Sequence, residues 1–303
     1  MPLCNSIPLI IGPTAVGKTE VAHKLARKTN SEIISADSRA VYKGLEIGTA
    51  TPEPRLIEEV PYHLISFLDP RRRYSAKDFQ RDVEEKIQKI ADGCGKPIIV
   101  GGSRLYVKAL TQGLFEGPGA DREIRSRLSR RSGEELHHRL QEVDPKSAEN
   151  IHPNDQKRLI RALEVYEITG RPISVLQDEA EPLPHSLTKI ALLRDRKSLY
   201  RRIEERVEEL IDRGLVQEVR ELLQRGFSED WGAWNTIGYK ELVLHLEGEI
   251  SLEEAKEAIK TNTRHLAKYQ LGWIRSEECQ HQFDLDKSRT SQVVERLVSL
   301  TYC

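Results

Sequence analysis

The sequence predicts an α/β protein in which helices flank a parallel sheet and an all-helical insert interrupts it. Short apolar runs alternate with helical patterns over residues 7–113, which is typical of a right-handed parallel sheet. The alternation stops near residue 114, where glycines and a proline form a linker, and charged helical segments follow. It resumes near residue 186. We therefore expect a sheet domain whose first part is 1–113, a helical insert at 114–185, and the rest of the sheet domain at 186–303.

The first apolar run, Ile7–Ile11, leads into a phosphate-binding loop. Two glycines flank four residues and Lys-Thr follows, which is the pattern of a loop whose backbone N–H groups surround an anion. The following helix start adds its positive dipole end. Lys18 supplies a charge for a terminal phosphate, and the Thr19 hydroxyl can hold Mg²⁺. The sheet is therefore predicted to be P-loop NTPase-like, with phosphate bound by Gly12, Pro13, Thr14, Ala15, Val16, Gly17, Lys18 and Thr19.

A second short strand, Ser31–Asp37, ends in a carboxylate. Ligands of open α/β sheets lie beyond the carboxyl ends of the strands, so Asp37 is expected beside the phosphate loop. Two interpretations remain open. Asp37 either helps to hold Mg²⁺ or caps the next turn, or it is a general base. The polar, glycine-broken segment 38–52 that follows is predicted to be a ligand loop.

Two further strands complete the first part of the sheet. Tyr62–Phe67 is predicted as the third strand, and Lys96–Ser103 as a fourth that runs into a glycine turn. Between them, Ser75 and Asp78 cap a helix that Gly93 and Gly95 are expected to end near residue 92. The fourth strand ends in Gly-Gly where a P-loop ATPase usually has an aspartate, which disfavours a motor or switch ATPase.

The insert carries one specific feature, because Arg158 and Arg161 lie on one face of a helix and guanidinium groups suit phosphate or base edges. Leu187–Leu193 is predicted to rejoin the sheet as a strand. An amphipathic helix follows, in which Arg202 and Arg206 lie one turn apart. This pair is either a solvated face with glutamate partners or a clamp on an anionic ligand near the phosphate loop.

The last part of the chain is predicted to be helical. Residues 235–241 form a glycine-containing turn that enters a helix, and Ser251 caps a long helix to about Arg275. Within that helix, we expect Tyr269 and Trp273 to pack in the core rather than stack on bases. A closing helix is expected at about 288–300.

Composition narrows the class of protein. Hydrophobic residues make up 38% and charged residues 31% of 303 residues, with a net charge of -1, so any nucleic-acid contact must use local positive charge. No apolar run of membrane length and no secretory signal is found, so we expect a cytoplasmic protein without membrane contact. The cysteines form no C-x-x-C motif and are expected to be reduced thiols: Cys4, Cys94, Cys279 and Cys303.

Taken together, the motifs resemble those of the bacterial tRNA dimethylallyltransferases, the tRNA isopentenyltransferase family. The matching segments occur in order and span nearly the whole chain: 12–19, 37–38, 41–44, 47–50, 74–76, 100–106, 152–164, 237–241 and 262–270. The resemblance implies transfer of a dimethylallyl group from dimethylallyl diphosphate to N6 of the adenosine 3′-adjacent to the anticodon. The tRNAs would be those that read codons beginning with U.

The resemblance also implies roles for individual residues. Lys18, Thr19 and Asp37 would be catalytic. Thr19 would hold Mg²⁺, and Lys18 and Arg202 would offset charge on the diphosphate. Asp37 would either accept a proton from the attacking amine or hydrogen-bond to it. The adenosine would leave the anticodon-loop stack, and the insert would hold the anticodon stem of a tRNA bound to a monomer. Positions that match tRNA contacts are Asp37, Ser38, Arg39, Ala40, Ser103, Arg125, Lys157, Arg158, Leu159, Ile160, Arg161, Asn235, Thr236, Ile237, Gly238, Tyr239 and Lys240.

The chain departs from the family pattern at two positions. Ser103 stands where Thr is usual and keeps the hydroxyl, whereas Ala40 stands where Gln is frequent and removes a possible contact. No Cys/His spacing for the C-terminal zinc finger of eukaryotic relatives is present, which favours a bacterial-type or organellar enzyme. Three alternatives are an adenylate isopentenyltransferase, a small-molecule kinase and a non-catalytic RNA-binding module. AMP as acceptor, ATP turnover, and tRNA binding that is indifferent to Lys18 and Asp37 would distinguish them.

Overall fold

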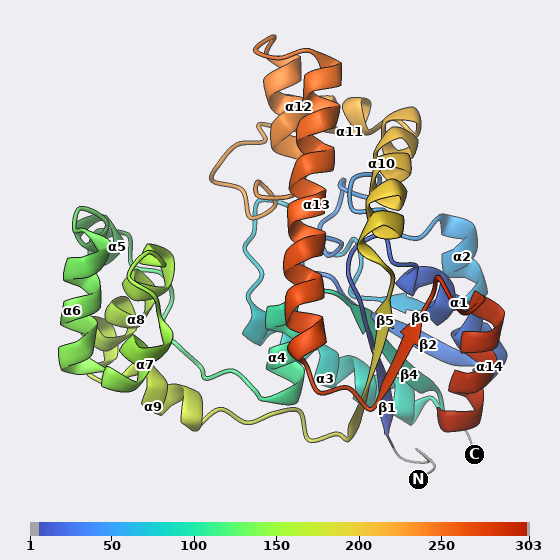
Figure 1. Ribbon diagram of the computed structural model, residues 1–303, viewed down its shortest axis with the longest axis horizontal. Helices are drawn as coiled ribbons and strands as arrows, with labels where there is room; N and C mark the ends of the chain where they lie inside the picture. The colour runs from blue at the N-terminus through green and yellow to red at the C-terminus, as the bar shows by residue number, and fades with distance from the viewer. Residues whose placement is uncertain (1–5, 302–303) are drawn as a thin grey trace. The chain divides into compact units, whose positions relative to one another are not determined.

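The computed structural model describes residues 6–301, and its internal contacts divide the chain into two units (Figure 1). The sheet unit joins the residues up to Thr111 with those from Leu183 onward. The helical unit is Gln112–Pro182. Cys4 and Cys303 lie outside the described residues, and Cys94 and Cys279 are free thiols. No helix among the described residues has the length and apolar character that crossing a bilayer requires.

The sheet unit is built on one parallel sheet with the strand order β3-β2-β4-β1-β5-β6. The central strand β1 pairs with β4 on one side and with β5 on the other. At the carboxyl edge, Ile11 pairs with Gly101, and Gly101 with Ala36. The loops after β1, β2 and β4 therefore leave the sheet side by side. The strands are β1 (Ile7–Ile11), β2 (Ser31–Ala36), β3 (Tyr62–His63), β4 (Lys96–Gly101), β5 (Leu187–Leu193) and β6 (His281–Asp284).

Helices cover this sheet and extend beyond its edge (Figure 1). Among them, α1 and α14 pack against each other, and α13 packs against both α10 and α12. The helices of the sheet unit are α1 (Lys18–Thr29), α2 (Pro54–Glu59), α3 (Ala76–Asp92), α4 (Arg104–Thr111), α10 (Arg196–Asp212), α11 (Leu215–Gln224), α12 (Tyr239–Leu246), α13 (Leu252–Ser276) and α14 (Thr290–Thr301).

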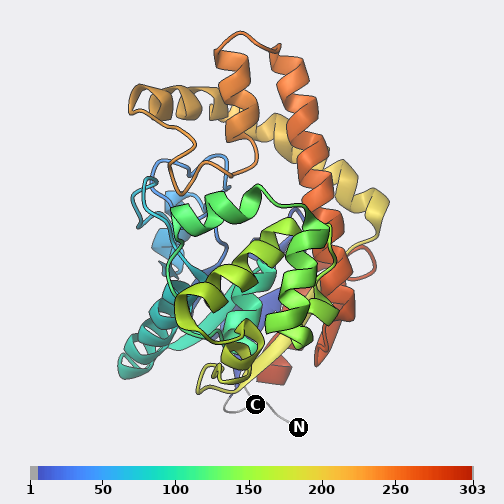
Figure 2. The same ribbon diagram turned by 90° about the vertical axis from the view of Figure 1, so that its left-hand side faces the viewer.

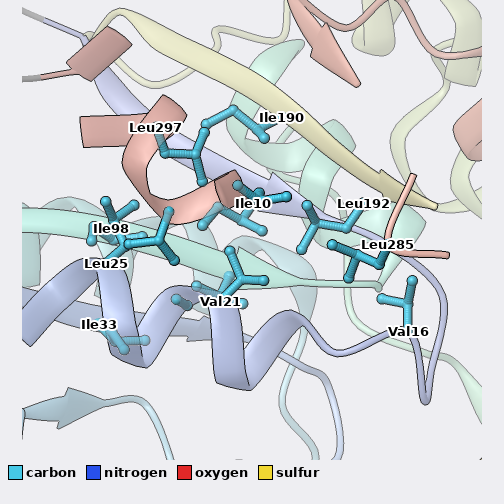
Figure 3. Close-up of a cluster of buried hydrophobic side chains, with 14 of the residues drawn as sticks. Ile10, Val16, Val21, Leu25, Ile33, Ile98, Ile190, Leu192, Leu285 and Leu297 are labelled. Carbon is cyan, nitrogen blue, oxygen red and sulfur yellow. The ribbon is translucent and has the colours of Figure 1, made fainter. Parts of the chain in front are cut away.

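One hydrophobic cluster joins the strands to the helices on them (Figure 3). Ile10, Ile98 and Ile190 from the strands meet Val21 of α1 and Leu297 of α14. A second cluster lies among α10–α13 and the loop 41–50, with Tyr239 fully buried in it. Burial of apolar surface on this scale is the main stabilising term in folding. It holds the phosphate loop and the loop 41–50 on a rigid support.

The helical unit, green to yellow-green in Figure 2, has a core of its own. Leu128, Leu136, Leu140, Leu159 and Leu163 are all fully buried there. Its helices are α5 (Arg122–Ser129), α6 (Gly133–Val143), α7 (Pro145–Asn150), α8 (Gln156–Thr169) and α9 (Ile173–Asp178).

A buried carboxylate fixes the ends of two short helices in this unit. Asp144 is 2% exposed and accepts four hydrogen bonds, from the amides and hydroxyls of Ser147 and Ser174, at 2.6–3.1 Å. The two amides belong to the first turns of α7 and α9, where backbone N–H groups have no partner within the helix.

Most predicted elements are confirmed, but the third strand is wrong in length. The prediction gave Tyr62–Phe67, whereas β3 is Tyr62–His63. Leu64 and Ser66 have φ of 59° and 45°, left-handed values that a strand does not tolerate. The turn that they form lets the amides of Ser66 and Phe67 donate to the carbonyls of Ala40 and Val41. The segment therefore supports the ligand loop after β2 instead of extending the sheet.

Other differences concern short elements. The sequence did not predict α2, α4, α9, α11 or β6, which have ten residues or fewer each. At the end of α3, Gly93 keeps a negative φ of -81°, and Cys94 takes the left-handed conformation with φ of 59°. Tyr269 is also not in the core, because it is 51% exposed, while Trp273 is 4% exposed as expected. The i,i+4 spacing puts both on neighbouring turns, but the second lies deeper against the sheet unit.

Candidate functional site

The phosphate loop, Gly12–Thr19, connects β1 to α1 in a conformation that few sequences tolerate. Ala15 and Gly17 have φ of 60° and 109°, so the chain turns through left-handed conformations just before the helix begins. A Cβ on Gly12 would lie 2.8 Å from the Leu192 carbonyl oxygen, so only glycine fits between β1 and β5. Successive amides near a helix N-terminus in such a turn form an anion-binding concavity.

Two arginines hold the carbonyl side of this loop. The Nε of Arg202 donates to the Ala15 carbonyl at 2.8 Å, and the Nε of Arg194 donates to the Val16 carbonyl at 3.0 Å. Arg194 also pairs with Asp286 at 2.6 Å, which fixes its guanidinium. Arg202, expected as a clamp on the ligand, thus uses its Nε to shape the loop. Arg194 was not found from the sequence.

Gln270 of α13 joins the phosphate loop to the glycine turn after β4. Its Oε1 accepts from the Thr14 amide at 2.8 Å, and its Nε2 donates to the Gly102 carbonyl at 2.9 Å. Gln270 is 7% exposed, so these bonds replace water contacts that burial removes. The sequence feature that indicates this role is a polar side chain on a helix that is expected to pack on the sheet.

Lys18 lies where the two glycine turns meet. Its Nζ donates to the Pro13 carbonyl at 2.8 Å, and a Cβ on Gly102 would be 3.5 Å from Nζ. Burial lowers the pKa of Lys18 to about 8, the Asp37 carboxylate raises it, and Arg206 lowers it. Two cations and one carboxylate thus act on each other beside the loop. An anion placed there would stabilise the charged ammonium.

Asp37 leaves β2 as an exposed carboxylate with two different oxygens. Oδ1 accepts from the amides of Arg39 at 2.8 Å and Ala40 at 3.3 Å, which caps the turn. Within the described residues, Oδ2 has no hydrogen-bond partner. Asp37 therefore caps the turn, which is one of the roles left open above, and its second oxygen stays unbonded among the described residues.

Arg206 of α10 is the cation next to Lys18 and Asp37. Burial lowers the pKa of its guanidinium, and the charges of Asp37 and Glu209 raise it. Its Nη2 donates to the Thr49 carbonyl at 3.4 Å. The sequence indicates Arg202 rather than Arg206 as the cation for the diphosphate. In the structure, Arg202 donates to the Ala15 carbonyl, and Arg206 interacts electrostatically with the Asp37 carboxylate.

The loop that provides the Thr49 carbonyl is held from α11 and α12. The Glu218 carboxylate accepts from the amides of Ile47 at 2.8 Å and Gly48 at 3.0 Å, and from the Tyr239 hydroxyl at 2.7 Å. Burial raises the pKa of Glu218, and the three hydrogen bonds lower it. A Cβ on Gly48 would lie 2.4 Å from the Tyr239 oxygen, so the ring packs directly on the loop backbone.

Most of the remaining predicted positions of the sheet unit fall into two groups, while Asn235 is exposed and Ile237 is partly exposed. Ser38, Arg39 and Ser103 are partly exposed beside the carboxyl edge of the sheet, and Lys240 lies over the Trp234 ring at 5.5 Å. By contrast, Ala40, Thr236, Gly238 and Tyr239 are buried, and Tyr239 is 0% exposed. The buried side chains support the loop backbone and present no free polar group.

In the helical unit, two predicted arginines converge on one carboxylate. Arg125 donates to Glu164 through Nε and Nη2, and Arg161 donates through Nη1, all at 2.7–2.9 Å. Glu164 is 0% exposed, and these bonds lower its pKa against the effect of burial. Leu159 is also buried, while Lys157 and Arg158 are exposed. Lys157 and Arg158 are therefore the accessible cations of this segment.

A depression of about 590 Å³ lies along α13, between His265 and Ser276. Its lining includes the exposed Tyr269 with Arg104, His265, Lys268 and Trp273. An aromatic face among cations suits nucleobases and phosphates. We had assigned Tyr269 to the core, so this surface was missed.

Metal binding by protein side chains alone is not supported in residues 6–301, where no group of three or more His, Cys, Asp or Glu side chains could hold an ion. The exposed Thr19 hydroxyl and the free oxygen of Asp37 are single oxygen donors. Mg²⁺ in phosphate sites usually takes one or two protein oxygens and completes its shell with phosphate oxygens and water. The donor set therefore fits Mg²⁺ only together with a phosphate ligand.

Comparison with protein families matches residues 40–277 to the model described as IPP transferase. The chain is 46% identical over 272 residues to a protein named tRNA dimethylallyltransferase 2 from Geotalea uraniireducens, covering 88% of both chains. It is 42% identical over 304 residues to the tRNA dimethylallyltransferase of Carboxydothermus hydrogenoformans, covering 98% of this chain and 97% of that one.

Solved structures give the same result. The full-length tRNA isopentenylpyrophosphate transferase of Bacillus halodurans is similar with a TM-score of 0.71 and 36% identity, covering 97% of this chain and 96% of that one. A eukaryotic dimethylallyltransferase described as acting on tRNA aligns with a TM-score of 0.80 and 27% identity. That alignment covers 98% of this chain and 80% of the eukaryotic one.

Proposed function

This chain belongs to the IPP transferase family, and we propose from that membership that it transfers a dimethylallyl group from dimethylallyl diphosphate to tRNA. The acceptor atom is N6 of the adenosine 3′-adjacent to the anticodon, in tRNAs that read codons beginning with U. The observation that carries the proposal is the meeting of an anion-binding loop, two cations and an open carboxylate at one edge of the sheet. The enzyme acts as a monomer in the cytoplasm.

The diphosphate binds in the phosphate loop, from Gly12 to Thr19. Lys18 and Arg206 face its charge, while Arg194 and Arg202 keep the loop in shape through its carbonyls. Thr19 would hold Mg²⁺ on the diphosphate, and the ion would supply further positive charge for the leaving group. Fixed cations lower the activation barrier because they stabilise the negative charge that develops on the leaving group.

The acceptor adenosine approaches from the side of Asp37. As its N6 forms a bond to the first carbon of the dimethylallyl group, the bond from that carbon to the diphosphate oxygen breaks. The nitrogen then loses one proton, and Asp37 accepts it through Oδ2 while Oδ1 keeps the turn capped. The base must leave the anticodon-loop stack to reach this position.

The tRNA is held by partly exposed groups near this position and by the helical unit. In the sheet unit these are Ser38, Arg39, Ser103 and Lys240, with backbone from Asn235 to Gly238. In the helical unit, Lys157 and Arg158 contact the anticodon stem, while Glu164 fixes Arg125 and Arg161. The buried Leu159, Thr236 and Tyr239 shape these surfaces from below.

A transfer assay tests the proposal directly. The protein, Mg²⁺ and labelled dimethylallyl diphosphate are incubated with unmodified tRNA, and in parallel with AMP. Label on the adenosine beside the anticodon is expected. Label on AMP alone would assign the protein to the branch that uses free nucleotides. No label on either acceptor would overturn the proposed transfer, and ATP turnover would then be measured.

A further inference from the structure

Three consecutive arginines, Arg71–Arg73, form an exposed basic triplet in the loop between β3 and α3. The Arg71 side chain is 63% exposed, pairs with Asp69 at 3.1 Å, and lies over the Trp231 ring at 5.6 Å. Among residues 6–301, no carboxylate forms an ion pair with Arg72 or Arg73. Two cations in water with no partner do not contribute to folding, so they are available to a ligand.

The triplet stands on a fixed backbone. The amides of Gly232 and Ala233 donate to the carbonyls of Arg71 at 3.4 Å and Pro70 at 3.1 Å. A Cβ on Gly232 would lie 2.0 Å from the Arg72 carbonyl oxygen and 2.9 Å from the Tyr42 hydroxyl. Gly232 therefore contacts both the triplet and Tyr42 of the ligand loop after β2.

This anchoring places the triplet beside the acceptor side of the site. Arg39, two residues after Asp37, donates to the Gly232 carbonyl at 3.3 Å. Both Arg39 and Arg73 act electrostatically on the Tyr42 hydroxyl, whose pKa burial raises and these cations lower. This part of the surface has four arginines, Arg39 and Arg71–Arg73, against the carboxylates of Asp37 and Asp69.

We propose that Arg71–Arg73 bind the phosphate backbone of the acceptor RNA next to the modified adenosine. The proposal rests on the proposed function and adds a binding surface to it. Guanidinium groups pair with phosphate oxygens in a forked geometry, and exposed arginines need no base identity to do so. Trp231 stacks under Arg71 and limits its freedom, which lowers the entropy lost on binding.

Binding of unmodified tRNA across a series of salt concentrations tests the proposal. The variant Arg71→Gln/Arg72→Gln/Arg73→Gln should bind more weakly at low salt. The slope of log affinity against log salt should become shallower by about 0.7 for each single-strand phosphate that the variant no longer neutralises. Affinity for inorganic diphosphate should not change, since the phosphate loop is untouched.

The matched control removes three exposed cations elsewhere on the sheet unit, in Arg27→Gln/Lys28→Gln/Arg296→Gln on α1 and α14. This control should keep the wild-type salt slope. A triplet variant with wild-type slope and affinity, or an equal loss in both variants, would overturn the proposal. Failure of the proposed function is seen separately, as absence of transfer to tRNA by the wild-type protein.

Discussion

At the scale of single residues, Asp37 separates two tasks between its two oxygens. Oδ1 holds the turn through the amides of Arg39 and Ala40, and Oδ2 has no hydrogen-bond partner among the described residues. The sequence located this carboxylate because a strand that ends in Asp beside a phosphate loop places it at the sheet edge. It did not reveal the division of labour, which depends on the conformation of the turn.

Asp37→Asn preserves an oxygen for the cap and removes the proton acceptor. We expect turnover to fall by about 10²–10⁴-fold, the usual contribution of a general base, which is far more than the change in affinity for diphosphate. Asp37→Ala removes the cap as well and should also lower thermal stability. Single-turnover transfer rates and calorimetric melting distinguish the two variants. Wild-type turnover in Asp37→Asn would exclude the assignment.

Lys18 should make diphosphate binding depend on pH. Because its pKa in the free protein is about 8, it is charged below that pH and loses its proton as the pH rises through it. Above that pH, Lys18 must take up a proton before it can pair with the diphosphate. The affinity should therefore fall with rising pH, approaching a decrease of about tenfold for each pH unit. Lys18→Arg stays charged over this pH range and is the matched control. Protonation of the diphosphate itself affects binding to both proteins equally. Equal pH profiles for both proteins, measured by calorimetry, would contradict this.

At the scale of elements, helices were predicted correctly where the sequence contains both a capping motif and an amphipathic pattern. Helices α3 and α13 were predicted because Ser75 with Asp78 and Ser251 with Glu254 form capping boxes before long amphipathic patterns. The error at Tyr62–Phe67 arose because Leu64 and Ser66 take left-handed conformations that tertiary contacts impose. Short elements such as β6 depend on pairing with β5, which no local pattern contains.

Helix α11 contributes an element-level prediction through Glu218. Glu218→Gln keeps one acceptor oxygen but turns an NH₂ group toward a backbone amide, so the turn at Ile47 and Gly48 should shift with Thr49. Arg206 would then lose its carbonyl partner. We expect kcat to fall by about 10- to 100-fold with little change in KM for tRNA, because small misplacements near the chemistry are costly.

Glu221→Gln is the control for this variant, since Glu221 lies on the same helix and is exposed. Combining Glu218→Gln with Arg206→Ala should add little to the loss caused by Arg206→Ala alone. Fully additive losses in the transfer assay would mean that Glu218 does not act through Arg206.

At the scale of the whole molecule, the chain folds into two units, each with hydrophobic packing of its own. The sequence predicted both the sheet and the helical insert, because their patterns differ so clearly. The sequence also predicted that the site residues of the sheet unit lie together, since parallel strands bring their carboxyl ends to one edge. It could not separate Lys157 and Arg158, which are exposed, from Leu159, which is buried, because that depends on which face of α8 meets α5 and α6.

Arg158 tests the role of the helical unit in the whole protein. Arg158→Ala should weaken tRNA binding and lower the salt slope by about 1, without changing diphosphate affinity. Arg130→Ala, another exposed arginine of the same unit, is the matched control. Filter binding with an anticodon stem-loop measures both. An unchanged tRNA affinity for Arg158→Ala would argue against a stem contact by this segment.

The chain leaves and re-enters the sheet unit at one point. The Leu183 amide donates to the Leu110 carbonyl at 3.1 Å, and within the helical unit a Cβ on Gly113 would lie 2.2 Å from the Glu181 carbonyl oxygen. Both units therefore close upon themselves where the chain passes between them. Doubling the length of such a loop costs only about 0.6 kcal/mol in closure entropy. Evolution is thus free to lengthen, shorten or replace the inserted segment while the diphosphate chemistry stays unaltered.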